Sequence, residues 1–473
     1  MAYWLIFRGT DKKAGKEPVR DDVKPAAVAI LAGILLLLAT PSLKAQKSYS
    51  LADCKKIAME NNTQVKNAGL EVEASKQTKM MAFTRFFPKI EAAGLAFQAK
   101  DPLFQFNIKG GNLPVYKGDL ASLITTNQYA YFPDVTMSYF GKGTLGMISA
   151  VQPLFAGGRI ITGNALATLG ISVSNSREIL SRNDVLLKTE QDYWQVIMLH
   201  EKLKAQLLGE KLLDTLYRQA SDAWHSGLIN RNDVMKVMLK QGDLKVSRLQ
   251  LENGIKMATM ALCQTMGMDF DTTLVLSDSL TILLPPSAVW VDPAGALQNR
   301  EEYRLLQKSV EAEELQSRMK LGEYLPEVGV GIGSYYTNMM GDQLGNTVAF
   351  ATAKIPISGW WEASHSIKER RIREEIAENS SKNTASRLIL QIRQYWFDLT
   401  EAYKQIEVIS ESLGQAGENL RINSDNFNAG TVNISDMLEA QVLMQQTRNR
   451  FAEVLSDYHI ALTKYKQATG RYE

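Results

Sequence analysis

The sequence contains one set of landmarks twice, 203 residues apart. One landmark is a tetrapeptide ending in Gly, followed at fixed spacing by Asn and Asp: residues 224–227, Asn230 and Asp233 in the first copy, and residues 427–430, Asn433 and Asp436 in the second. Upstream, the motif around Pro153 corresponds to the motif around Pro356, again 203 residues later. A shared order of landmarks over half the chain indicates a duplicated architecture. Two similar halves predict a ring in which each protomer supplies two near-equivalent parts of the wall.

The N-terminal region predicts export. Residues 26–39 form an apolar run of 14 residues, which follows Lys24 and precedes Ala45-Gln46. A membrane-spanning helix needs about 20 apolar residues, so this run is too short. A short apolar core followed by a small residue is typical of a secretory signal peptide, here residues 1–45, with cleavage near Ala45. The region before the core is longer than usual, so the true start codon stays open.

Composition and side-chain spacing argue against several functional classes. The net charge of +2 gives no general attraction to nucleic acid. The two cysteines, Cys54 and Cys263, and the four histidines show no metal-binding or catalytic spacing, and no phosphate-binding loop is present. We therefore expect buried, structural cysteines, no cofactor, no metal and no enzymatic activity.

Helical and strand periods alternate along the chain. A helical pattern over residues 50–86 ends at Pro88, and a period of two follows it. The remaining predicted elements of this kind are a strand over 144–155, a helix over 292–324, and strands over 328–337 and 346–357. The strands are about ten residues long, which is the length a tilted strand needs to cross a bilayer.

Each pair of strands precedes a long helix, a Gly-containing turn and a return helix. The stretches 162–223 and 362–426 contain no proline, and each would extend about 90–100 Å as a continuous helix. The second return helix carries large side chains seven residues apart, at Met437, Met444, Phe451, Tyr458 and Tyr465. This seam is typical of coiled coils, and it predicts a coiled-coil wall.

The first half contains about 35 residues more than the second between its two strands. These fall at roughly 101–142 and are rich in Phe, Tyr, Gly and Pro. The simplest expectation is a plain surface loop, and the alternative is a lid, plug or partner-binding surface.

Taken together, these landmarks resemble the TolC family of outer-membrane efflux proteins. The resemblance runs from Ser50 to the C-terminus, and its most specific parts are the motif at 152–159 and the two Gly turns. It implies a mainly α fold with transmembrane β: a long helical coiled-coil barrel in the periplasm, and four strands per protomer in a trimeric, twelve-stranded outer-membrane β-barrel. Closure by three protomers would remove open strand edges from lipid. The structural repeats would be 46–290 and 291–473, with helix–strand junctions at Pro88, Pro153, Pro326 and Pro356.

The resemblance also assigns roles to the two turns. Gly227, Leu228, Gly430 and Thr431 would form the tip on which a periplasmic adaptor docks, and Asp436, Glu439 and Asp233 would lie at the narrow periplasmic aperture. The alternative is that the glycines only end helices and the Asn and Asp residues cap the next ones. The family's polar latch is missing, because Phe427 and Val432 occupy its positions. The closed state would then depend on Arg231 or on apolar packing.

The resulting functional prediction is a passive homotrimeric channel-tunnel in the outer membrane. It would export small molecules or polypeptides in a tripartite efflux or type I secretion system. Its partners would be an adaptor (membrane fusion) protein, an inner-membrane transporter of the resistance-nodulation-division or ABC type, and outer-membrane lipid. The alternative is a periplasmic coiled-coil scaffold or adaptor without a pore. The ten-residue amphipathic strands argue against that alternative.

Overall fold

The structure, a computed structural model, describes residues 48–471 apart from 117, 126, 282–283 and 340–342. The predicted signal peptide and its cleavage site lie outside the described residues. Tyr49–Glu473 form one compact unit. Apart from Ser48, all residues of the helices and strands discussed below belong to this unit.

Both halves of this unit follow the same order of elements. The first half contains α2 (Leu51–Asn61), α3 (Thr63–Phe83), η1 (Thr84–Phe86), β2 (Lys89–Gln98), β7 (Lys142–Ala156), α5 (Arg159–His225) and α6 (Arg231–Met266). The second half contains α7 (Pro293–Leu297), α8 (Glu301–Gly322), β9 (Glu327–Asn338), β10 (Gln343–Lys354), α9 (Gly359–Asn428) and α10 (Ile434–Ala468). Helices α5 and α9 are 67 and 70 residues long. The predicted mainly helical fold with a smaller strand-containing part is confirmed.

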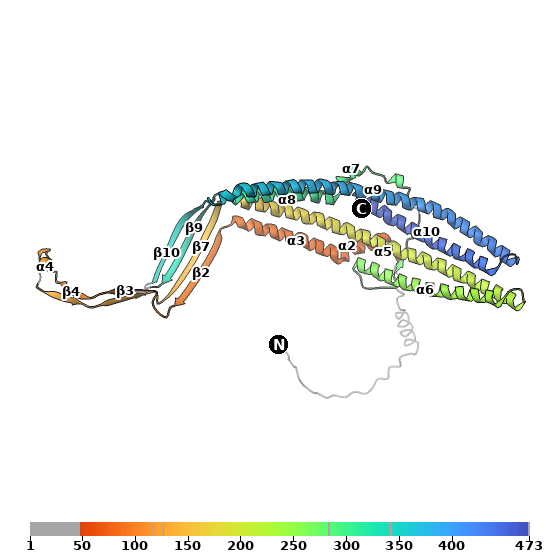
Figure 1. Cartoon of the computed structure of the whole chain (residues 1–473), viewed down its shortest axis with the longest axis horizontal. Coiled ribbons are helices and arrows are strands. Elements are labelled where there is room, and N and C mark those ends of the chain that lie inside the picture. The colour runs from red at the N-terminus through yellow and green to blue at the C-terminus, as the bar shows by residue number, and fades with distance from the viewer. Residues whose placement is uncertain (1–47, 117, 126, 282–283, 340–342, 472–473) are drawn as a thin grey trace, which may run out of the picture. The chain divides into compact units, whose positions relative to one another are not determined.

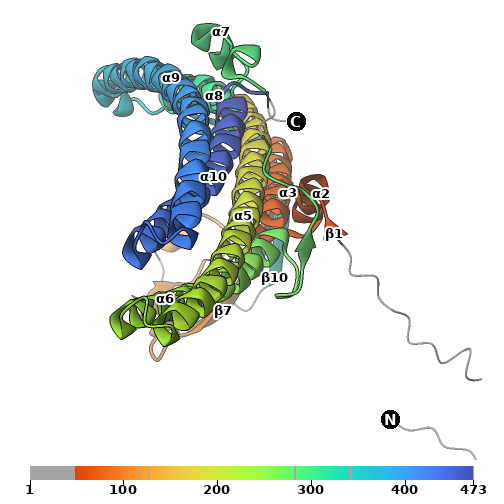
Figure 2. The ribbon, with the colours of Figure 1, turned by 90° about the vertical axis from the view of Figure 1, so that its right-hand side faces the viewer.

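The long helices pack as two antiparallel hairpins, α5–α6 and α9–α10, which meet through α5 and α10. Helix α3 packs on α5, and α8 packs on both α5 and α9. Viewed along the hairpins, these helices lie side by side in a curved layer (Figure 2). The turns of both hairpins lie at the end of the helices opposite the strands (Figure 1). No helix among the described residues is long and apolar enough to span a membrane.

Four strands form an antiparallel sheet in the order β10-β9-β7-β2. The β7–β9 pairing joins the two halves, with Ala150 opposite Ile332. Strands β2 and β10 lie at the edges and have a sheet neighbour on one side only. Within the part of the chain that the structure describes, the sheet therefore has two open edges.

One predicted junction is corrected by this sheet. Pro88, Pro326 and Pro356 lie between a helix and a strand, whereas Pro153 lies inside β7. The ladder between β7 and β9 is irregular between Pro153 and Phe155. Proline has no N–H to donate and is accommodated at such bulges.

The chain turns into α5 at Gly157 and Gly158, whose φ values are +61° and +76°. A Cβ at Gly157 would lie 2.1 Å from the carbonyl oxygen of Gly322, so only glycine fits.

The predicted loop at 101–142 is not a plain loop. It contains β3 (Phe104–Ile108), β4 (Gly111–Pro114), α4 (Ala121–Ile124), β5 (Tyr129–Phe132) and β6 (Val135–Tyr139). Strand β3 pairs with β6 and β4 pairs with β5, both antiparallel. The amide of Ala99 donates to the carbonyl of Gly141 at 2.8 Å, which continues the β2–β7 pairing toward β3 and β6. We call the β3–β6 pair the ribbon.

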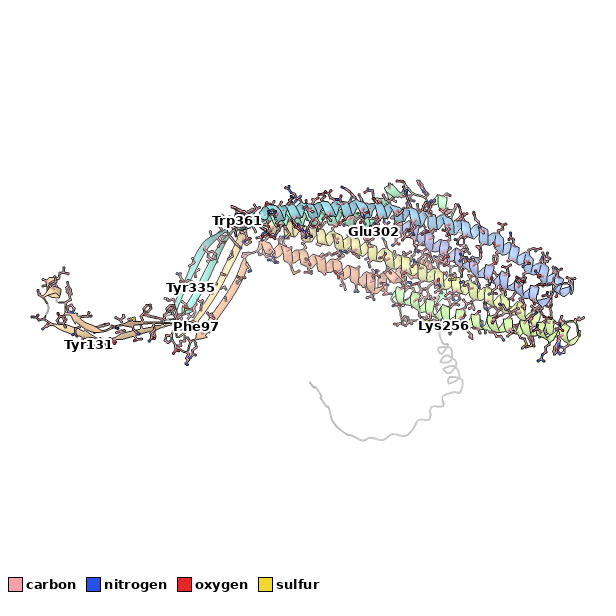
Figure 3. All side chains as sticks on the ribbon, viewed as in Figure 1. Phe97, Tyr131, Lys256, Glu302, Tyr335 and Trp361 are labelled. Atoms are coloured by element: carbon pink, nitrogen blue, oxygen red, sulfur yellow. The ribbon has the colours of Figure 1, made fainter. Side chains whose placement is uncertain are left out.

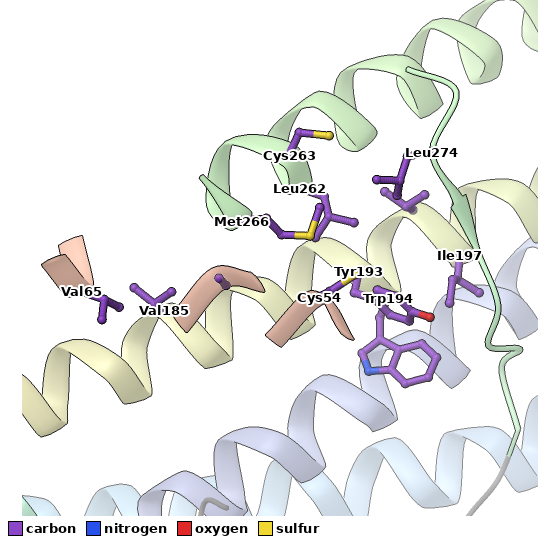
Figure 4. Close-up of a cluster of buried hydrophobic side chains, with 12 residues drawn as sticks. Cys54, Val65, Val185, Tyr193, Trp194, Ile197, Leu262, Cys263, Met266 and Leu274 are labelled. Atoms are coloured by element: carbon purple, nitrogen blue, oxygen red, sulfur yellow. The ribbon is translucent and has the colours of Figure 1, made fainter. Parts of the chain in front are cut away.

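A compact core lies where α2, α5 and α6 meet (Figure 4). Cys54 and Cys263 are fully buried there as free thiols, as the sequence predicted. The buried Tyr193 donates its hydroxyl hydrogen to Asp278 at 2.9 Å. This connects α5 to the segment that follows β8 (Val275–Leu276), and the amide of Ser277 donates to the carbonyl of Tyr49 in β1 (Ser48–Tyr49). Hydrogen bonds from Tyr193 and to Tyr49 thus attach the segment between the two repeats to the rest of the unit. This segment also includes η2 (Pro286–Ala288).

Candidate functional site

The two Gly turns have the same backbone geometry. The closing hydrogen bonds run from Gly227 N to Trp224 O (2.9 Å) and from Leu228 N to Ala223 O (2.8 Å), and in the second turn from Gly430 N to Phe427 O (3.0 Å) and from Thr431 N to Asn426 O (2.9 Å). The glycines have φ of +76° and +70°, which is the left-handed conformation of a helix C-terminus that ends in glycine. The sequence repeat at the turns is therefore a structural repeat. We refer to residues 224–233 and 427–436 together as the tip.

The residues that begin the return helices differ between the two turns. Asn433 caps α10, because its side-chain oxygen accepts the amides of Ser435 (2.8 Å) and Asp436 (3.1 Å). Asn230 holds the equivalent position in α6 without a side-chain capping bond. Asp436 and Asp233 lie in the first turns of their helices, where a negative charge is stabilised by the helix dipole. Of the Asn and Asp residues expected to cap the return helices, Asn433 does so, whereas Asn230 makes no side-chain capping bond and the capping side chain of α10 is not Asp436.

Two polar contacts join the hairpins at the tip. The ammonium group of Lys236 lies 3.1 Å from Asp233 Oδ1 on its own helix, and it donates to Ser435 Oγ at 3.0 Å on α10. Between α5 and α9, Gln219 Nε2 donates to Asn428 Oδ1 at 3.2 Å. Lys236 thus connects a predicted aperture residue to the start of the other return helix.

An apolar cluster fills the space between the hairpins behind these contacts. Its buried members come from α5, α6 and α10: Leu213, Leu216, Ala220, Val234, Val237, Leu244, Ile434 and Met437. Phe427 packs against this cluster as a partly buried side chain, whereas Arg231 is exposed. Of the two contacts expected to replace the family's polar latch, the apolar packing of Phe427 is the one seen among the described residues.

The predicted aperture carboxylates have different surroundings. Asp436 and Glu439 are exposed and three residues apart, so they lie on the same face of α10. Within the described part of the chain, neither takes part in an ion pair, whereas Asp233 is half-buried beside Lys236. The single chain therefore presents two unneutralised carboxylates and one that is already paired. No group of three or more His, Cys, Asp or Glu residues in the described segments forms a candidate metal site.

Two exposed apolar stripes were not predicted as surfaces. On α6 the exposed side chains are those of Met235, Leu239, Val246, Leu249 and Met257, and on α9 they are those of Leu390, Phe397, Val408 and Ile422. The spacings between these residues (three, four, seven, eight, eleven and fourteen) each return to about the same face of a helix, so the sequence carried this information. They could not show that the side chains stay uncovered within one chain.

Aromatic residues gather where the helices meet the strands. Phe83 packs edge-on against Phe87, with ring centroids 5.5 Å apart. Trp360 donates its indole N–H to the carbonyl oxygen of Tyr324 at 2.9 Å, and Trp361 is 81% exposed (Figure 3). Trp side chains such as these, with a half-buried Tyr beside them, are of the kind enriched at membrane–water interfaces.

Comparison with known proteins agrees with this architecture. Residues 293–471, the second repeat, match the family model described as "Outer membrane efflux protein". No curated protein sequence matches the chain.

Three solved structures share the fold over most of the chain. The CmeC outer membrane channel of Campylobacter jejuni has a TM-score of 0.69 and 14% identity over 89% of this chain and 86% of its own. The outer membrane protein VceC of Vibrio cholerae gives 0.67 and 12%, covering 89% of this chain and 96% of its own. The open MtrE outer membrane channel of Neisseria gonorrhoeae gives 0.70 and 13%, covering 89% of each chain. The second repeat is thus similar in sequence to the outer membrane efflux protein family, and the chain shares the fold of solved outer membrane channels over most of its length.

Proposed function

We propose that this protein is a passive, homotrimeric exit channel of the outer membrane, with residues 46–290 and 291–473 as its two structural repeats. The observation that carries the proposal is a four-stranded sheet with two open edges, placed at one end of paired helices about 70 residues long. Unpaired strand edges are very costly in lipid, where no water is present to bind them. Pairing β2 of one copy with β10 of the next satisfies both edges and gives twelve strands in three copies.

The exposed stripes on α6 and α9 support the same assembly. Large apolar side chains along helices of this length are rarely left in water when they are spaced for helix packing. Covering the α6 stripe of one copy with α9 of the next would extend the curved layer of Figure 2 into a closed ring. The ring would be the periplasmic tunnel.

The tip would form the periplasmic entrance. Three copies would place six carboxylates, those of Asp436 and Glu439, around one axis, and such a ring favours cations. The two glycine turns, with Leu228 and Thr431 exposed beside them, would supply the surface on which the adaptor docks. Family members are transport proteins. A passive channel supplies no energy of its own, so export against a concentration gradient must be driven by another protein. We therefore infer an adaptor and an inner-membrane transporter of the resistance-nodulation-division or ABC type as partners.

Reconstitution of the mature protein in planar lipid bilayers tests the channel. We expect discrete, long-lived conductance steps with a preference for cations. A protein that remains soluble without detergent and produces no conductance would instead be the pore-less periplasmic scaffold.

A further inference from the structure

The ribbon has one apolar and one polar face. Its register places Phe104 opposite Tyr139, Phe106 opposite Met137, and Ile108 opposite Val135. The alternate positions pair Gln105 with Ser138 and Asn107 with Thr136. Side chains of paired residues point to the same side of a sheet and successive ones to opposite sides. Five of the six side chains of one face are therefore apolar and the sixth, Tyr139, is an aromatic whose hydroxyl group donates to Met137 Sδ on the same face. All four side chains of the other face are polar.

Among the residues that the structure describes, most of this face is left exposed, and Val135 and Tyr139 are its half-buried members. Phe104 and Phe106 are 58% and 61% exposed, and Ile108 and Met137 are also exposed. A two-stranded ribbon is only marginally stable in water, and it needs packing on one face to be firmly ordered. The ribbon thus carries large apolar side chains that are typical of a buried surface, yet these side chains are exposed.

Phe140, which directly follows β6, has a strained backbone and packs against the apolar face. Phe140 has φ of +61° and is the one non-glycine residue with positive φ among those the structure describes. A bulky side chain in this conformation costs on the order of 1–3 kcal/mol. The Phe140 ring packs edge-on against Phe104, with centroids 5.7 Å apart, so the strained backbone places one more aromatic ring at the apolar face.

Lipid is a poor candidate to cover this face. In the assembly proposed above, on which this inference rests, β2 crosses the bilayer with ten residues, and ten tilted residues use its whole apolar thickness of about 25 Å. The ribbon begins after β2 has ended, beyond Lys100 and Asp101. It therefore lies in water outside the membrane, where only protein can cover it, and the other two copies of the chain are present there in fixed proportion.

Symmetry then determines how the copies meet. Neighbouring ribbons in a cyclic trimer could stack around the ring. The apolar face of each copy would then contact the polar face of the next copy. Three identical apolar faces can contact one another only when all of them are turned toward the common axis. We propose that the three ribbons pack their Phe104, Phe106 and Met137 side chains together on the trimer axis, forming a protein–protein interface outside the membrane.

Cysteine cross-linking at neighbouring residues tests this interface. Phe106→Cys places a thiol on the apolar face, and Gln105→Cys, one residue away, places it on the polar face. In intact trimers treated with copper phenanthroline, we expect Phe106→Cys to give a disulfide-linked dimer on non-reducing gels. Gln105→Cys should give at least several-fold less. Met137→Cys and Thr136→Cys form a second matched pair on β6.

The same samples separate this inference from the proposed trimer. Native mass spectrometry of each variant in detergent reports the number of copies. Intact trimers in which Phe106→Cys and Met137→Cys link no better than their controls would overturn the ribbon interface and leave the channel unaffected. Loss of the trimer in the wild-type protein would count against the proposed assembly itself.

Discussion

At the scale of single residues, Gly227 and Gly430 carry the tip geometry. Their positive φ values exclude an unstrained side chain, although open space surrounds both positions. Alanine at either position should cost about 1–2 kcal/mol, because a Cβ is disfavoured in the left-handed region. We expect larger or charged replacements to abolish efflux while the trimer still assembles, measured by drug susceptibility and native gels.

The control for this prediction is Gly414→Ala in α9. That glycine is helical and also has open space around it, so alanine should stabilise the helix by about 0.5–1 kcal/mol. If the turn substitutions destroy the trimer itself, the glycines have a structural role only.

The buried thiol of Cys54 gives a second prediction at this scale. Burial, reinforced by the negative charges of Asp53 and Asp278, raises its pKa to about 12. The thiolate is the reactive form, so at pH 8 almost none is present. Maleimide should leave Cys54 unmodified in the folded protein and label it after denaturation, as read by mass spectrometry. An exposed cysteine made by Phe270→Cys should be labelled at once. Rapid labelling of Cys54 would mean that α2 detaches readily from the core.

A third prediction concerns the entrance carboxylates. Replacing Asp436 with Asn and Glu439 with Gln removes up to six negative charges from the proposed constriction. In planar bilayers, cation preference and block by multivalent cations should both weaken, because the attracting field is local. Stability should change little, because the cap of α10 is Asn433 and stays in place.

Two single substitutions serve as comparisons for that double variant. Glu378→Gln, far along α9, should leave selectivity unchanged. Asp233→Asn removes the partner of Lys236, so it should alter opening rather than selectivity. Unchanged selectivity in the double variant would place the constriction elsewhere.

At the scale of elements, the sequence predicted most of the helices and the four-stranded sheet. Proline positions and changes of period located α3, β2, β9 and the two long helices, because proline acts locally on the backbone. Pro153 misled the prediction of a junction, because a bulge lets a strand continue past a proline. The ribbon was missed although Phe104–Ile108 alternates apolar and polar residues. Its pairing partner lies about 30 residues away and carries the same signal.

Contacts between elements were the least predictable part of the site. The sequence indicated Asp233 and Asp436 at equivalent positions, and it could not show that Lys236 reaches across to Ser435. Such a contact depends on how two helices from different repeats are rotated about their axes. The apolar packing of Phe427 was one of two alternatives at the sequence level, and the structure favours it.

A prediction about the paired hairpins follows from Lys236. Lys236→Met removes the contacts to Asp233 and Ser435 while keeping the length of the side chain. The hairpins should separate more readily, since a hydrogen bond to a charged group contributes about 1.5–3 kcal/mol. Larger or more frequent openings in single-channel recordings would show this. Lys240→Met, one turn further along α6, is the matched control and should behave as wild type.

At the scale of the whole molecule, the sheet has two open edges, and α6 and α9 carry exposed apolar stripes. Both features indicate that the chain is one subunit of a larger assembly. Among the described residues, β2 and β10 each have a strand neighbour on one side only, so one edge of each lacks a partner. The repeat in the sequence indicated a ring. The prediction of three copies came from the family resemblance and not from any residue of the sequence. An open strand edge determines which strand pairs with it, but it does not determine how many copies close the ring.

The central claim is that three copies share one channel, and mass tests it most directly. The mature protein, extracted from outer membranes in mild detergent, can be measured by native mass spectrometry. We predict a species of three chains that persists on dilution, because every copy supplies edges that the other two satisfy. A stable, conducting monomer would contradict the account.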